Sequence, residues 1–385
     1  MEIILKSCIH GNKKLDFKYP QEYDSVFRRM ADCPLPLVMY GTGDGAEKIT
    51  KVLRSFGREM AMYFSSDDFA RGERIFMDKP VVTYSDVCRK FDDFAVVLGF
   101  GTARPEVLWN IRRIASERKL FVPDIPPVSD ISNIETKIQN EIFLLNTDKE
   151  IMREVKAAGR LFCDKRSRHL YSALLEFRVT GDISCLDGTA TDDLYLPLYH
   201  SSVRYETAAD LGADRGESTL EMLARFPMLE RVLALEPDEN NLRRIGKLIP
   251  TERRIEAYNV AAADSSYVFT MMQDGSRGGS SSRDPNPKRK AVPRNVRAVS
   301  LDELLDNKGC ELIHIDVEGM EREAILGAKD TISFFRPDMM VSVYHRWRDL
   351  WELPLMLHKL MPEKRLHLVR PDALPPWDIM CIAEG

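Results

Sequence analysis

The sequence predicts an α/β protein that contains two Rossmann-like units joined by a helical segment. Apolar, strand-like runs alternate with helical patterns in residues 35–127 and again in residues 201–385, which is typical of parallel α/β units. The intervening residues 128–200 show only helical spacing. A chain of 385 residues is also too long for one ordinary core.

The first unit follows a lead-in, residues 1–34, that has little periodicity. LPLVMYG at 35–41 is typical of a buried strand, and a glycine turn and a helix follow it up to residue 57. A second strand at 58–68 ends in two acids. A third strand, a helix and a short strand complete the unit, at 93–101, 102–117 and 119–127. This alternation predicts a small doubly wound domain over residues 35–127.

The helical segment carries apolar residues at three- and four-residue spacing in 141–162 and 167–181. We expect it to connect the two units.

The second unit opens with a strand, a glycine turn and a helix in 205–226, followed by further strands at 231–236, 254–260 and 312–317. We expect one helix over 319–335, a strand over 338–345, a helix over 349–360, and a final hairpin from 364–370 and 377–383. Residues 273–295 are rich in Gly, Ser, Pro and Arg, which predicts a loop.

Bulk composition excludes several classes of protein. The formal net charge of -5 argues against a nucleic-acid binder. The seven cysteines form no CxxC pair, so neither a zinc site nor a disulfide framework is indicated, and a reducing, cytoplasmic location is expected. No run of the sequence approaches the length of a membrane span.

A motif for an adenosine-bearing cofactor lies at the start of the second unit. Asp210, Gly212 and Gly216 mark the end of a strand and the start of a helix, where glycines allow close approach of a ligand to the backbone. The next strand ends in Glu236, which is placed to accept both hydroxyls of a ribose. The third strand ends in Asn259.

The motifs DLGADRGEST, LALEPDENN, NVAAAD, IHIDVEGMEREAILGA and RPDMMVSVYHRWRDLWELP together resemble FkbM-type S-adenosylmethionine-dependent methyltransferases, over residues 160–385. The resemblance implies a class I methyltransferase sheet and methyl transfer to a hydroxyl of a sugar or polyketide-type product. His314 departs from it, because lysine is expected before IDVEG. The expected cofactor-binding residues are Asp210, Gly212, Ala213, Gly216, Glu217, Glu236, Pro237, Asn259, Ala261 and Asp316.

The catalytic residues are expected where carboxylates follow the fourth strand. A hydroxyl must lose its proton as it attacks a methyl group, so a general base is needed, and the candidates are Glu318, Asp316 and His345. Asp316 is better suited to positioning substrate or cofactor. As an alternative, Asp316, Glu318 and His345 could hold Mg²⁺, which would acidify a bound hydroxyl.

The first unit carries a second nucleotide-type fingerprint, YGTGDGA, with Gly41, Gly43 and Ala46 in the turn and Asp67 closing the next strand. An alternative function is therefore an NAD-dependent sugar oxidoreductase or dehydratase. Against it, the unit has no YxxxK sequence and no catalytic Cys/His pair. A third alternative is a nucleotide-sugar-binding protein without activity.

The expected acceptor is a sugar, a nucleotide sugar or a lipid-linked glycan. The 273–295 loop would cover it, and Arg277, Arg283 and Arg289 could meet its phosphates. The sequence leaves a homo-oligomer open.

Overall fold

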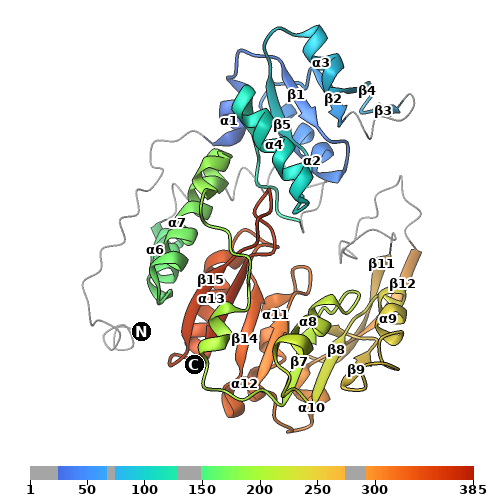
Figure 1. Ribbon diagram of the computed structural model, residues 1–385, viewed down its shortest axis with the longest axis vertical. Coiled ribbons are helices and arrows are strands. Elements are labelled where there is room, and N and C mark those ends of the chain that lie inside the picture. Colours follow the sequence, from blue (N-terminus) through green and yellow to red (C-terminus); the bar gives the residue numbers. More distant parts are fainter. Residues whose placement is uncertain (1–24, 67–73, 128–148, 274–291) are drawn as a thin grey trace.

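The protein folds into two α/β units, which lie one above the other in Figure 1, and a helical segment at the left of that view. The structure is a computed structural model and describes residues 25–66, 74–127, 149–273 and 292–385. Both units are built on sheets dominated by parallel strands, as the sequence predicts.

The first unit has one six-stranded sheet in the order β3-β4-β2-β1-β5-β6. All neighbouring strands are parallel except β3 and β4. The strands are β1 (Leu37–Tyr40), β2 (Met62–Ser65), β3 (Arg74–Phe76), β4 (Lys79–Thr83), β5 (Ala95–Leu98) and β6 (Lys119–Phe121). The helices are α1 (Val26–Ala31), α2 (Asp44–Ser55), α3 (Tyr84–Lys90) and α4 (Pro105–Glu117). The expected lead-in thus contains α1, whose Val26, Phe27 and Met30 are buried in the core.

The second unit has a seven-stranded sheet in the order β15-β16-β14-β13-β7-β8-β9. Only β16 runs antiparallel to its neighbours, which is the strand arrangement of a class I methyltransferase. The strands are β7 (Thr207–Leu211), β8 (Arg231–Leu235), β9 (Ile255–Tyr258), β13 (Leu312–Ile315), β14 (Asp338–Ser342), β15 (Arg365–Val369) and β16 (Met380–Glu384). The expected pairing of the last two strands is confirmed.

Along the chain, helices alternate with the strands of this second sheet. They are α8 (Glu217–Arg225), α9 (Glu239–Gly246), α10 (Leu301–Leu305), α11 (Glu321–Leu326), α12 (Lys329–Phe335) and α13 (Asp349–Leu360). The prediction of one helix over 319–335 is wrong, because the helix breaks after Leu326. At the break, a Cβ on Gly327 would lie 1.9 Å from the carbonyl oxygen of Ala263, which directly follows β10, so the close approach of the two segments leaves no room for a side chain.

A small sheet in the order β10-β12-β11 lies beside the second unit, formed by β10 (Ala261–Ala262), β11 (Tyr267–Gln273) and β12 (Val292–Val299). Part of the expected loop 273–295 is therefore strand, since β12 begins at Val292. The loop arginines Arg277, Arg283 and Arg289 lie outside the described residues.

The helical segment is packed against the second unit (Figure 1). Its main helices are α6 (Lys149–Leu161), which contacts α13, and α7 (Lys165–Thr180), which contacts β15. Helix α7 begins where the Asp164 carboxylate accepts a hydrogen bond from the Ser167 N–H, and it ends at Gly181 in the left-handed conformation. Two short 3-10 helices, η3 (Ile183–Leu186) and η4 (Leu196–His200), lead to β7.

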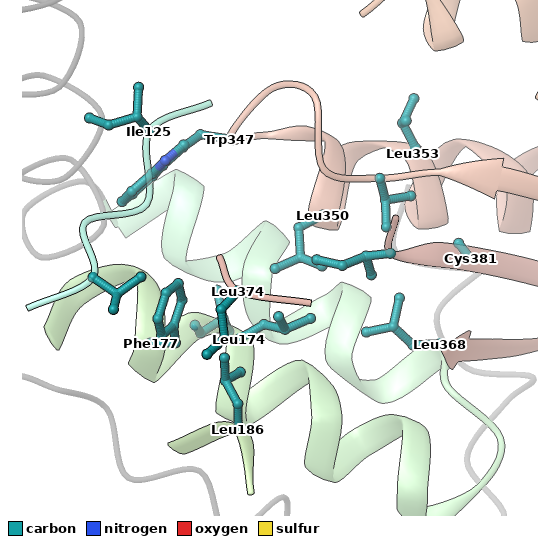
Figure 2. Packing of buried hydrophobic residues seen from close by; sticks show 14 of the residues in the cluster. Ile125, Leu174, Phe177, Leu186, Trp347, Leu350, Leu353, Leu368, Leu374 and Cys381 are labelled. Carbon is teal, nitrogen blue, oxygen red and sulfur yellow. The ribbon is translucent and has the colours of Figure 1, made fainter. Parts of the chain in front are cut away.

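One hydrophobic core joins all three parts. Figure 2 shows Ile125, which follows the first sheet, in the same cluster as Phe177 of α7 and Trp347 of the second unit. A buried ion pair of 3.0 Å joins Asp124 to Arg178, which also donates to the Trp347 carbonyl. The units are therefore fixed to each other by packing and by buried polar contacts.

Candidate functional site

The turn after β7 lies close to the turn after β13. Gly212 has φ +88°, and a Cβ at this position would lie 1.9 Å from the carbonyl oxygen of Asp316. The N–H groups of Gly212 and Ala213 donate to the Leu235 carbonyl at 3.0 Å each. Gly216, with φ +86°, starts α8. The glycines thus allow three strand ends to converge at the carboxyl edge of the sheet, where open α/β sheets bind ligands.

We expect Gly212→Ala to destabilise the protein more than Gly188→Ala. Both glycines have a positive φ, which costs an alanine about 1–2 kcal/mol. Only at Gly212 does the new methyl group also collide with backbone, whereas nothing lies within 4 Å of a Cβ on Gly188. The added strain should cost about 1–3 kcal/mol more. Urea unfolding of the two variants measures this difference, and equal losses would show that the close approach to Asp316 does not matter.

Asp210 is fully buried at the end of β7, and its carboxylate is occupied by protein groups. It accepts hydrogen bonds from Ser218 at 2.7 Å and from Thr219, and its other oxygen lies 2.8 Å from Nδ1 of His314. Burial disfavours the charge on His314, but the bond to Asp210 raises the pKa of the imidazole. Asp210 therefore fixes the start of α8 to β13, and His314 is its buried partner.

Glu236 lies directly after β8 and is 6% exposed. Its two carboxylate oxygens accept backbone N–H groups, one from Asp214 at 2.9 Å and one from Asp238 at 2.7 Å. Burial raises the pKa of Glu236 to about 8, and these hydrogen bonds only partly oppose the rise. A carboxylate that is fixed in this way, with further lone pairs on both oxygens, can accept hydrogen bonds from a diol.

Among the remaining expected cofactor residues, Asn259 contacts Glu236 directly. Asn259, which follows β9, is exposed and donates its amide to the carbonyls of Glu236 and Pro237, at 3.0 and 3.1 Å. Ala261 is buried in β10, and Glu217 is exposed at the first position of α8. Glu236 and Asn259 thus follow the neighbouring parallel strands β8 and β9 at one edge of the sheet.

The expected catalytic residues meet at the next two strand ends. Asp316 and Glu318 follow β13, and His345 follows β14. Nε2 of His345 lies 3.5 Å from Oδ1 of Asp316 and 3.4 Å from Oε2 of Glu318. Glu318 has φ +52°, a rare conformation for a residue other than glycine, and such strain clusters at functional sites. The structure thus brings these three side chains together at one rim of the sheet.

The Nδ1 side of His345 faces the carboxylate of Glu321. Glu321 is not among the site residues that the sequence predicts. Nδ1 of His345 lies 2.8 Å from Oε1 of Glu321, and the same oxygen accepts the N–H groups of Val317 and Gly319. His345 is 0% exposed and Glu321 1%. Glu321 is the first residue of α11, and the pairing of β13 with β14 brings its carboxylate next to the imidazole.

The charged groups at this rim shift one another's pKa values. Burial disfavours the cationic form of His345, yet the facing carboxylates raise its pKa well above the usual range. Burial raises the pKa of Asp316 to about 6, which the charge on His345 partly opposes. Because His345 is enclosed and favours its charged form, it is unsuited to taking a proton from a substrate. Glu318, whose side chain is 45% exposed, and Asp316, at 28%, face the outside.

The fingerprint of the first unit has a packing explanation at two positions. A Cβ on Gly41 would lie 2.6 Å from the ring of Phe100, and Ala46 is buried against Gly99. Gly43 faces open space, since nothing lies within 4 Å of a Cβ there. Asp67 lies outside the described residues. The described part of this turn therefore shows close packing of a strand, a helix and an aromatic ring.

Comparison with known proteins agrees with this geometry. Residues 210–367 match the family described as Methyltransferase FkbM domain. The chain carries an FkbM methyltransferase domain. The matched range begins at Asp210 and includes every residue discussed above from the second unit. The domain is that of an S-adenosylmethionine-dependent methyltransferase.

One solved structure has the same overall fold. The structure of methyltransferase FkbM from Methylobacillus flagellatus KT is 18% identical, with a TM-score of 0.63, and the match covers 90% of this chain and 89% of that one. Fibrillarin from Aeropyrum pernix in complex with S-adenosyl-L-methionine is 13% identical over 47% of this chain and 66% of that one, with a TM-score of 0.29. No curated protein matches the sequence.

None of the described helices has the length and apolar character of a membrane span.

Proposed function

We propose that this FkbM protein transfers the methyl group of S-adenosylmethionine to a hydroxyl of a sugar or glycan. The observation that carries the proposal is Glu236, a buried carboxylate fixed by two backbone N–H groups at the end of the second strand of a class I methyltransferase sheet. A hydroxyl pair of a ribose is the ligand group that this position suits.

The residues around Glu236 fit the rest of the cofactor. Gly212 lets the turn after β7 approach the Asp316 carbonyl closely, and Asn259 would lie beside the ribose and the adenine because it donates to the Glu236 carbonyl. When bound, S-adenosylmethionine supplies an electrophilic methyl group and leaves as the thioether. The protein's main contribution is to align the acceptor oxygen with that methyl group, since alignment alone supplies much of the rate in such displacements.

The acceptor proton would pass to a carboxylate of the rim. Glu318 and Asp316 are partly exposed beside the expected position of the methyl group, whereas His345 is enclosed behind them. We therefore propose that Glu318 or Asp316 accepts the proton. His345 and Glu321 would keep these carboxylates in position. This replaces the expectation that His345 could itself be the base.

A sugar, a nucleotide sugar or a lipid-linked glycan remains the proposed acceptor, on the ground of the sequence resemblance. The alternative NAD-dependent reaction would use the first unit, where Phe100 occupies the space beside Gly41. The described cysteines are all free, which agrees with action in a reducing compartment, the proposed cytoplasm.

Transfer of a labelled methyl group tests the proposal. The full chain is incubated with S-adenosylmethionine labelled with ¹³C in the methyl group and a panel of nucleotide sugars and lipid-linked glycans. We expect a new signal at the shift of a methyl ether in carbon NMR. Labelling confined to nitrogen, sulfur or carbon atoms of other acceptors in a parallel panel would contradict O-methylation.

A further inference from the structure

Two buried polar atoms of the catalytic rim lack a hydrogen-bond partner among the described residues. They are Oδ1 of Asp316 and Nε2 of His345, and they face each other across 3.5 Å. Buried polar atoms are nearly always satisfied, so an orphaned pair of this kind indicates a ligand, an ion or a water molecule. Oε2 of Glu318 lies 3.4 Å from the same ring nitrogen.

The distances fit an ion better than direct hydrogen bonds. A charge-assisted N–H to carboxylate bond is about 2.7–2.9 Å long. Nε2 of His345 instead lies 3.4 and 3.5 Å from the two carboxylate oxygens. Two ligand atoms each about 2.1 Å from a tetrahedral metal ion are about 3.4 Å apart. Each of the two carboxylate oxygens thus lies from Nε2 at the distance expected between two ligands of one ion.

Glu321 holds the imidazole in the orientation that metal binding requires. Its carboxylate faces Nδ1 at 2.8 Å, so Nδ1 carries a proton and Nε2 points at the two outer carboxylates. Metal-binding histidines usually donate their second ring N–H to a carboxylate in this way. Without an ion or a proton at Nε2, its lone pair would face two carboxylates at close range.

A second group of ligand-type side chains lacks this signature. Cys163, Asp164 and His367 also lie within reach of one another. However, both ring nitrogens of His367 are already within 3.0 Å of carboxylate oxygens, of Asp164 and of Glu384. This group is satisfied by its own hydrogen bonds and serves as an internal comparison.

We propose that Asp316, Glu318 and His345 bind a divalent transition-metal ion, of the kind represented by Zn²⁺. An imidazole ligand favours zinc over magnesium, which prefers six oxygens, so the expected Mg²⁺ is the less suitable ion. Three protein ligands leave a position open on the exposed side, where an acceptor hydroxyl could bind. The inference rests on the proposed function only for that last role, because ion binding itself needs no substrate.

Calorimetric titration of the full, chelator-treated chain with Zn²⁺ and with Mg²⁺ tests the proposal. We expect one Zn²⁺ per chain, bound at least ten times more tightly than Mg²⁺. Asp316→Asn and Glu318→Gln should each weaken Zn²⁺ binding at least about tenfold, since each removes a charged ligand. Cys163→Ser and His367→Asn should leave it unchanged.

Absence of Zn²⁺ binding would overturn the proposal, and so would binding that survives both rim substitutions or that is lost with Cys163→Ser. A titration of the same metal-free protein with S-adenosylmethionine separates this failure from failure of the proposed function. Cofactor binding without Zn²⁺ binding rejects the ion alone, whereas loss of cofactor binding rejects the methyltransferase function whatever Zn²⁺ does.

Discussion

Replacing Glu318 with glutamine is expected to lower methyl transfer by about 10²–10⁴-fold, the usual contribution of a group that removes a proton in the transition state. The substitution keeps the shape of the side chain and its place beside Nε2 of His345 but removes its charge. Affinity for S-adenosylmethionine should stay within about threefold, the mark of an interaction made only in the transition state. Initial rates with the labelled cofactor, together with calorimetry, measure both quantities.

Glu363→Gln is the matched control, because Glu363 is an exposed glutamate before β15 that pairs with Arg336 away from the rim. It should leave both the rate and the affinity unchanged. A Glu318→Gln enzyme with full turnover would show that neither proton removal nor ion binding depends on this carboxylate.

Replacing Glu236 with glutamine should weaken S-adenosylmethionine binding by about 10- to 150-fold. Hydrogen bonds to a charged group contribute about 1.5–3 kcal/mol, which corresponds to that range of dissociation constants. Glu230→Gln is the control, since Glu230 is exposed at the other end of the same strand. Calorimetry on both variants should show a large loss for Glu236→Gln and none for Glu230→Gln. Equal affinities would mean that the ribose does not contact Glu236.

The same residue should make cofactor binding depend on pH. The pKa of Glu236 is raised to about 8 in the free protein, and a diol that donates hydrogen bonds favours the ionised form. The bound state therefore has the lower pKa, and affinity should rise with pH up to about 8 and then level off. Between pH 6 and pH 8 the gain can reach about 50-fold, because the ionised fraction of Glu236 in the free protein rises from about 1% to about one half. Glu236→Gln should remove this rise, whereas Glu230→Gln should keep it.

Local sequence patterns are sufficient to predict those site residues that directly follow a strand. Gly212, Glu236 and Asp316 each follow a buried apolar run, and the carboxyl ends of parallel strands share one edge. The pairing of His345 with Glu321 could not be predicted in this way, because it depends on β14 lying beside β13 and on the turn at Gly319.

Other features depend on contacts between distant segments. The helix break at Gly327 follows from its approach to Ala263, and the packing role of Gly41 follows from Phe100, some sixty residues later. The sequence alone shows a helical period in the first case and a glycine fingerprint in the second. In both cases the local sequence pattern does not include the distant residue, Ala263 or Phe100, that the glycine packs against.

Titration of the unmodified chain with S-adenosylmethionine and, separately, with NADH tests the central claim most directly. If the second unit is an active methyltransferase domain, calorimetry should show one S-adenosylmethionine per chain, and NADH should neither bind nor compete. Binding of NADH without binding of S-adenosylmethionine would contradict the claim and move the chemistry to the first unit.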